Sequence, residues 1–280
     1  MRKVLHASLF LLLVCFAAFS QQTPTQPQSL TFYYDYTVNP GKEDEFMNLI
    51  KLVRAPVRDK LMAEGVIQAW GMETPILRQP GGTTNLIWFS VANMGDVEKV
   101  LTAMEAQQAK LEAEAKASKS KTPSERIRET VDMSKTRDWL TIDLVSGFSS
   151  PQPAPGVLPV TRYNFVKAKP GKGNDYRRTW EKYNKPVFDK LVADGVILAF
   201  GLSTEAVRTE GNFTHYVWMA TTNMGGLDKI AAAFAADRAR RTEDERNPIT
   251  QAFNDATEPD MARSIVTRSR IFHLPPPKKQ

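Results

Sequence analysis

The feature that most constrains the fold of this chain is a long internal repeat. Residues 56–71 read PVRDKLMAEGVIQAWG and residues 186–201 read PVFDKLVADGVILAFG, 130 positions further along the chain. Between 40–71 and 170–201, fourteen of 32 positions are identical without a gap, which two unrelated segments would not achieve. A period of this length indicates two copies of a domain-sized unit rather than the turns of a solenoid.

The first copy contains strand and helix signals in a fixed order. Aromatic and β-branched residues predict strands over 30–38, 66–73, 85–92 and 138–147. Apolar residues at helical spacing predict a helix over 42–63 that ends at Gly65, and a second helical region after Asn93. Pro56 is expected to kink the first helix or divide it in two. The order strand, helix, strand, strand, helix, strand is that of a ferredoxin-like unit.

The second copy repeats this order over 160–273. Between the copies, residues 149–159 contain four prolines and predict a stiff linker, and residues 274–280 predict a disordered tail. An apolar sheet face has to be covered, and each copy can cover the other. We therefore expect an α+β fold in which two ferredoxin-like repeats, 30–148 and 160–273, form one intramolecular barrel.

The second strand of each copy has one bulky face and one face of smaller residues. Trp70 and Phe200 belong to the bulky faces, whereas Gly71 and Gly201 belong to the others. We expect the small residues to face a helix, because they would let it approach the sheet closely.

The first twenty residues have the pattern of an export signal. Arg2 and Lys3 precede an apolar run, and small residues stand just before Gln21. We expect residues 1–20 to be a signal peptide, whose removal would also remove Cys15, the only cysteine. The mature protein would be periplasmic or secreted, without disulfides and without stable membrane insertion. An uncleaved N-terminal anchor is the main alternative.

The composition favours an ordinary globular protein with a solvated surface. Hydrophobic residues make up 42% of the chain, enough for a buried core. The formal net charge is +6, and the basic residues are interspersed with acidic ones. Because a nucleic-acid surface needs clustered positive charge, we expect no nucleic-acid partner.

Several of these features together resemble a known superfamily. The Pro40-Gly41-Lys42 turn, the proline-interrupted first helix, the Gly-Val-Ile strand at 65–67 and the polar cap at Asn93 are similar to those of dimeric α/β barrels, especially NIPSNAP-like and EthD-like members. In that superfamily two ferredoxin-like units pair their sheets into one barrel, usually as a homodimer. The resemblance implies a pseudo-dimer within this single chain. The superfamily includes cofactor-free monooxygenases, haem enzymes, lactone isomerases and members without known activity, so the fold does not choose a function.

Two residues are candidates for acid–base chemistry. His215 lies on the third strand of the second copy, where the first copy has Asn85. Together with Tyr163 or Tyr33, it could accept a proton in a cleft. The alternative is a polar strand position that is satisfied by a neighbour or faces solvent.

The second copy is also the more polar one at its first strand. Arg162 and Asn164 replace Phe32 and Tyr34 of the first copy, so we expect a ligand pocket beside them. Aromatic residues on the strands either line an apolar cavity for an aromatic ligand or form the barrel core. Among these aromatic residues we predict five ligand contacts: Tyr33, Trp70, Trp88, Phe200 and Trp218.

We expect neither a metal nor a cofactor. The sequence has no paired cysteines and no His-x-x-x-His motif, and zinc sites take three or four such ligands. It also lacks a nucleophile elbow and a glycine-rich phosphate loop. Haem is disfavoured but not excluded, since His273 could serve as an axial ligand.

The sequence therefore leaves two classes of function open. The first is an exported protein that binds a small apolar or aromatic molecule, or has an accessory role, without clear catalytic machinery. The alternative is a cofactor-free monooxygenase-like or isomerase-like enzyme that acts on a phenolic or quinone-like substrate. The lack of a strong catalytic constellation favours the first class.

Overall fold

The computed structural model describes residues 28–78, 82–149, 156–209 and 213–274. The predicted signal peptide, positions 150–155 of the predicted linker and positions 275–280 of the predicted tail lie outside these residues. The described strands are β1 (Leu30–Tyr36), β2 (Ile67–Pro75), β3 (Asn85–Val91), β4 (Arg137–Phe148), β5 (Val160–Val166), β6 (Ala199–Glu205), β7 (His215–Thr221) and β8 (Arg263–His273).

The α-helices precede or separate these strands. They are α2 (Glu43–Leu49), α3 (Ala55–Ala63), α4 (Met94–Ala117), α5 (Pro123–Thr130), α6 (Gly173–Tyr183), α7 (Lys185–Ala193), α8 (Met224–Ala239) and α9 (Glu243–Ala256). Within the described ranges, no helix combines the length and the apolar character that a membrane span would need.

The strands close into one antiparallel barrel in the order β1-β3-β2-β8-β5-β7-β6-β4. Each half of the chain contributes four neighbouring strands, β4-β1-β3-β2 from the first and β8-β5-β7-β6 from the second. The halves join at two seams, where β2 pairs with β8 and β6 pairs with β4. Strands from both halves of the chain therefore form a single closed barrel.

The strand register is the same in the two halves. Tyr33 pairs with Trp88 in the first half, and Tyr163 pairs with Trp218 in the second. These pairs are related by the sequence offset of 130, so a residue of one half can be compared directly with its counterpart in the other.

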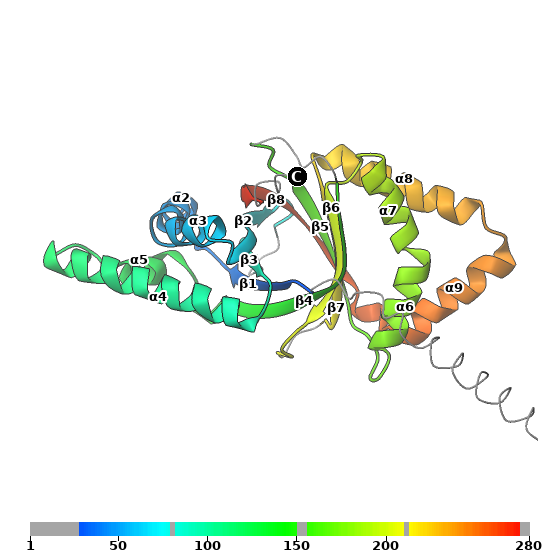
Figure 1. Cartoon of the computed structure of the whole chain (residues 1–280), viewed down its shortest axis with the longest axis horizontal. Coiled ribbons are helices and arrows are strands. Elements are labelled where there is room, and N and C mark those ends of the chain that lie inside the picture. Colours follow the sequence, from blue (N-terminus) through cyan, green and yellow to red (C-terminus); the bar gives the residue numbers. More distant parts are fainter. Residues whose placement is uncertain (1–27, 79–81, 150–155, 210–212, 275–280) are drawn as a thin grey trace, which may run out of the picture.

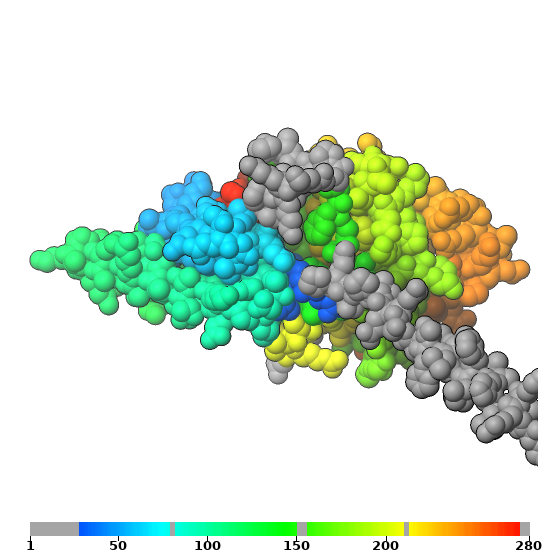
Figure 2. Space-filling view, viewed as in Figure 1, coloured from blue at the N-terminus to red at the C-terminus, as the bar shows by residue number. Residues whose placement is uncertain are grey.

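The helices cover the outside of the barrel on two opposite sides. Figure 1 shows α2–α5 on one side and α6–α9 on the other, and Figure 2 shows the two helical lobes flanking the strands. Each lobe packs on its own sheet through a separate apolar core: Phe46, Ile50 and Trp70 belong to the first, and Trp180 and Phe188 to the second. A third core fills the barrel itself.

The small residues of β2 and β6 face the barrel interior rather than a helix, so the expectation for these faces was wrong. A methyl group at Gly71 would lie 2.9 Å from the indole of Trp88, and one at Gly201 would lie 2.4 Å from the indole nitrogen of Trp218. Two bulky indoles therefore fit inside the barrel only because the neighbouring strand lacks side chains there. Trp70 instead belongs to the core beneath the helices.

Pro56 lies at the start of α3, just after a π-helical turn over Ile50–Arg54. The first helix is thus interrupted but not separated into two, because the π turn continues directly into α3. In the second half the corresponding break is sharper, since α6 ends at Tyr183 and α7 begins at Lys185. Proline cannot supply the backbone N–H that an uninterrupted α-helix needs at this point.

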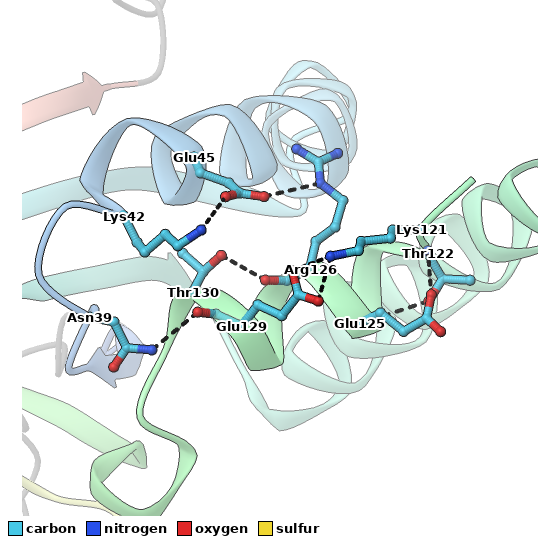
Figure 3. A network of polar contacts seen from close by, with 9 residues as sticks. All are labelled: Asn39, Lys42, Glu45, Lys121, Thr122, Glu125, Arg126, Glu129 and Thr130. Carbon is cyan, nitrogen blue, oxygen red and sulfur yellow. Dashed lines mark hydrogen bonds and ion pairs between the residues drawn. The ribbon is translucent and has the colours of Figure 1, made fainter.

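A polar network holds α5 against the start of α2, as Figure 3 shows. Glu45 forms an ion pair with Arg126 at 3.5 Å, and Asn39 donates to the Glu129 carbonyl at 3.1 Å. The Thr122 hydroxyl accepts from the Glu125 N–H at the start of α5, and the Thr122 N–H donates to the Glu125 carboxylate, which completes a capping box. These contacts fix the outer lobe of the first half.

Candidate functional site

The barrel interior is a packed aromatic core. Its members are Tyr33, Leu86, Trp88, Trp139, Tyr163, Phe165, Phe213 and Tyr216, with Trp218 packed against them. Trp139 stacks on Tyr33 with ring centres 4.1 Å apart and meets the Phe213 ring edge-on at 5.4 Å. Tyr33, Trp88 and Trp218, which the sequence named as ligand contacts, therefore lie in the core.

A buried carboxylate organises one end of this core. Glu73 is 2% exposed and accepts hydrogen bonds from the Trp88 indole and the Tyr163 hydroxyl, each at 3.1 Å, and from Thr267. Burial raises the pKa of Glu73, while these donors act in the opposite direction. Tyr163 and Thr267 come from the second half, so this network joins the two halves across the β2/β8 seam.

The β6/β4 seam also pairs a carboxylate with a serine, with the serine on β6 of the second half and the carboxylate on β4 of the first half. Glu73 faces Ser269 across β2/β8, whereas Ser203 faces Asp143 across β6/β4. The Ser203 hydroxyl donates to Asp143 at 2.5 Å and accepts from the Trp218 indole at 3.2 Å. Burial raises the pKa of Asp143 to about 6, although its hydrogen bonds act to lower it. Each seam thus holds one carboxylate and one serine.

A pocket lies outside the barrel, between the sheet of the second half and its helices. It has a volume of about 280 Å³. Its wall is formed by residues of β5, β7, α6, α7 and α8: Arg162, Asn164, Tyr176, Trp180, Asn184, Phe188, Val217, Met219, Leu227, Ile230, Ala231 and Phe234. A hollow with aromatic walls and several polar groups is typical of a site for a small organic ligand.

The polar groups of the pocket lie on its strand side and on α6. Arg162 is exposed and donates from Nε to the Asn164 side chain at 2.9 Å, and Asn164 also accepts from Ser264 at 2.7 Å. The Tyr176 hydroxyl makes no hydrogen bond to a described residue. Burial raises the pKa of Tyr176, which therefore keeps its proton and is available as a donor.

His215 is next to this pocket but is not part of its wall. Its ring meets the Tyr176 ring edge-on at 5.3 Å, and its Nδ1 lies 2.9 Å from the Thr214 hydroxyl. Burial, with a smaller effect of Arg208, lowers the pKa of His215 to about 4. The imidazole is therefore neutral near pH 7.

The corresponding location in the first half carries different side chains. The counterparts of Asn184 and Phe188 are Arg54 and Arg58, and the Arg58 side chain is 0% exposed among aromatic rings. The two halves of the duplication have therefore diverged at the same location.

The structure brings together some of the residues that the sequence selected and separates others. Arg162 and Asn164 line the pocket, and Phe200 packs behind it against Phe188. Tyr163 points into the barrel and His215 toward α6, on opposite faces of the sheet. These two side chains cannot act in one cleft.

Trp70 lies in the other half of the molecule. Its indole donates to Asp59 at 3.0 Å and stacks on His273 with ring centres 4.8 Å apart. Its position is remote from the pocket of the second half, because it belongs to the core beneath α2 and α3.

Sequence reasoning missed the helical side of the pocket. Tyr176 and Trp180 of α6 and Phe234 of α8 form aromatic walls, but at helical spacing they read only as core positions. A comparison of the two copies could have indicated this side of the pocket, because Asn184 and Phe188 replace the two arginines of the first copy.

The described residues contain no group of three or more side chains able to hold a metal ion. Neither described histidine is placed to act as an axial haem ligand in this pocket. No histidine lines the pocket, His215 packs on Tyr176, and His273 stacks on Trp70 in the other half.

No protein-family model and no curated protein matches this chain. Solved structures do match. A candidate monooxygenase from Fusobacterium nucleatum has a TM-score of 0.57 and 12% identity over 88% of this chain and 94% of its own. A second candidate monooxygenase, from Lactobacillus acidophilus, has a TM-score of 0.55 and 11% identity over 88% and 96%. An anthrone oxidase-like protein has a TM-score of 0.52 and 11% identity over 91% and 96%.

These likenesses show the fold. The chain shares the α+β barrel fold of these solved structures. They do not point to the NIPSNAP-like or EthD-like members, and at this level of identity they leave substrate and activity open.

Proposed function

We propose that the second half binds a small planar aromatic molecule with a phenolic or quinone-like oxygen. The observation that carries this proposal is the 280 Å³ pocket with its aromatic walls. Tyr176 lines this pocket, and its hydroxyl makes no hydrogen bond to a described residue. Ligand pockets usually have volumes of about 300–1,000 Å³, so this one suits a molecule of one or two rings.

The wall residues define how such a ligand would lie. Trp180 and Phe188 offer buried aromatic surface, and Phe234 of α8 forms part of the same wall. The Tyr176 hydroxyl can donate to a ligand oxygen, and the exposed Arg162 guanidinium can stabilise a phenolate. The ring would rest against the helices, with its oxygen toward Tyr176 or the Arg162 rim.

The first test is a titration of the purified protein with 1-naphthol, followed by ligand fluorescence. We expect Phe234→Ala to weaken binding about tenfold through lost ring contact, and Tyr176→Phe to weaken it about 2–10-fold through one lost hydrogen bond. Leu77→Ala is the matched control, because Leu77 is 76% exposed and lies outside the pocket. Equal affinity of all four proteins, or no binding by the unchanged chain, would refute the site.

A second candidate function is cofactor-independent oxygenation of the same ligand. Two structural neighbours are candidate monooxygenases, and a neutral His215 contacts the pocket wall. With 1-naphthol, one oxygen atom of O2 would bond to the ring carbon opposite the hydroxyl. The other would leave as water with two substrate hydrogens, giving 1,4-naphthoquinone. No external reductant is needed.

Oxygen uptake separates this candidate from simple binding. If His215 assists proton removal, the protein should consume one O2 per 1-naphthol, and His215→Gln should lower the rate at least about tenfold while affinity is kept. Binding without oxygen uptake would exclude oxygenation of this ligand and leave the binding function intact.

Three finer inferences belong to the same proposal. The common strand order of the halves supports two ferredoxin-like repeats. The turn and capping residues quoted above support a place near the NIPSNAP-like and EthD-like members. The N-terminal pattern of residues 1–20 supports export to the periplasm or the medium.

A further inference from the structure

Two neighbouring arginines of the first half, Arg58, which is buried, and Arg54, which is partly exposed, have no acidic partner within 4.0 Å among the described residues. The Arg58 side chain is 0% exposed, and its Nε, Nη1 and Nη2 atoms have no hydrogen-bond partner. Arg54 donates from Nη2 to the Tyr36 hydroxyl at 2.8 Å, but its Nη1 is buried and unpaired. Across the described ranges, neither guanidinium is within 4.0 Å of a carboxylate oxygen.

Aromatic rings surround both guanidinium groups. The central carbon of Arg58 lies 5.6 Å from the Tyr34 ring centre, 5.4 Å from that of Trp70 and 5.8 Å from that of Phe89. Arg54 lies 4.5 Å from the same Tyr34 ring. Cation–π contacts offset part of the desolvation of a guanidinium, but ring faces are weak acceptors and leave its N–H groups without strong hydrogen bonds.

The nearby carboxylates do not neutralise this pair. Asp59 accepts from the Trp70 indole at 3.0 Å, and Asp138 is exposed at the sheet surface. Burial is the main cause that lowers the pKa of Arg58, to about 9, and the positive charge of Arg54 is the second. The Arg58 guanidinium is still a cation at pH 7. A buried cation without a close anion is costly, and no carboxylate oxygen of the described residues lies within 4.0 Å of it, although Asp59 acts on it from further away.

The arrangement is specific to the first half. Its counterparts in the second half are Asn184 and Phe188, which bear no charge. In addition, Arg54 is the last residue of the π-helical turn, and such turns often occur at functional sites. Arg54 is partly exposed while Arg58 is buried behind it, so the pair extends from the surface inward.

We propose that Arg54 and Arg58 form a binding site for a small oxyanion, a carboxylate or a phosphate. Two oxygens of a carboxylate or of a phosphate can accept two parallel N–H bonds from one guanidinium and a further bond from the second. The unpaired Nη1 of Arg54 and the three unpaired nitrogens of Arg58 supply these donors. The site is separate from the pocket of the second half and does not depend on the function proposed for it.

The test uses the full chain and three probes: acetate, benzoate and inorganic phosphate, each at constant ionic strength and pH 7. Calorimetric titration and the thermal unfolding midpoint are measured for the unchanged protein, Arg58→Met and Arg54→Gln. Methionine fills a similar volume without charge and suits an apolar surrounding. Arg128→Met, at an exposed arginine of α5, controls for loss of a surface charge.

We expect saturable binding of at least one probe, with an unfolding midpoint that rises with its concentration. Arg58→Met should weaken that binding about 10–100-fold and Arg54→Gln about tenfold, while Arg128→Met leaves it unchanged. Preference for benzoate would identify a carboxylate-bearing aromatic ligand, and preference for phosphate a phosphorylated one. The proposal fails if no probe binds saturably, or if Arg58→Met binds as well as the unchanged protein. Either result would show that the aromatic rings alone accommodate the pair.

Discussion

Replacing Trp139 by alanine should lower the free energy of unfolding by about 3–5 kcal/mol, the usual cost of removing a large buried aromatic side chain. Trp139 belongs to β4 of the first half, yet its ring centre lies within 6.3 Å of the ring centres of three residues of the second half: Phe165, Phe213 and Tyr216. Its loss would open a cavity in the core that the two halves share. Urea unfolding followed by circular dichroism measures the change.

Two controls make this result specific. Trp139→Phe should cost much less, because it keeps an aromatic ring and the Trp139 indole nitrogen has no hydrogen-bond partner to lose. Leu52→Ala, at a side chain that is 47% exposed on the π-helical turn, should change stability by less than about 0.5 kcal/mol. A loss below about 1 kcal/mol for Trp139→Ala would mean that the barrel interior does not tie the halves together.

The second large effect concerns pH. Asp143→Asn should make the protein more stable than the unchanged chain at pH 8 by about 1–3 kcal/mol, with little difference at pH 4. The upper limit of this stability difference follows from a pKa of about 6 in the folded state against about 3.9 in the unfolded state. The lower limit allows for the partial exposure of Asp143, which reduces the effect.

The sign follows from proton binding. Because burial raises the pKa of Asp143, the folded state holds a proton between about pH 4 and pH 6 that the unfolded state has released. Stability from this group is therefore greatest below pH 4, falls as the pH rises through 6, and is constant above that. Asparagine cannot ionise, so this part of the pH dependence disappears.

Urea unfolding at pH 4, 5, 6, 7 and 8 measures the difference between the two proteins. Asp189→Asn provides the control, since Asp189 is an exposed residue of α7 paired with Lys185. It should leave the shape of the stability profile unchanged. Parallel profiles for Asp143→Asn and the unchanged protein would show that Asp143 is not protonated inside the folded barrel.

The sequence was sufficient to predict the barrel because the relevant signal is long and repeated. The PGK turns, the second-strand motif and the tryptophans at 88 and 218 recur at one offset, so both halves had to adopt one architecture. The orientation of the second strand was beyond such reasoning. Both faces of that strand are buried, and only the position of Trp88 beside Gly71 shows which face is inside.

The candidate site was predictable on its strand side alone. Arg162 and Asn164 stand out because they are polar where the first copy is aromatic. Tyr176 and Trp180 do not, since aromatic residues at helical spacing are normally core. The pairing of His215 with Tyr163 failed because alternation places positions 163 and 215 on opposite faces once the β5/β7 register is known.

The pair of Arg54 and Arg58 illustrates another limit of prediction from the sequence. Arg54 and Arg58 are one helical turn apart, a spacing that normally marks a solvated face. Only the packing of α3 on Tyr34, Trp70 and Phe89 reveals that the second guanidinium is enclosed.

The most direct test of the central claim, that the second half holds the ligand while the equivalent positions of the first half are occupied by arginines, is a crystal structure of the protein with 1-naphthol. We predict density for one molecule between β5, β7 and the helices α6–α8, with its oxygen near Tyr176 or Arg162. Density inside the barrel or beneath α2 and α3, with the predicted pocket empty, would contradict the account.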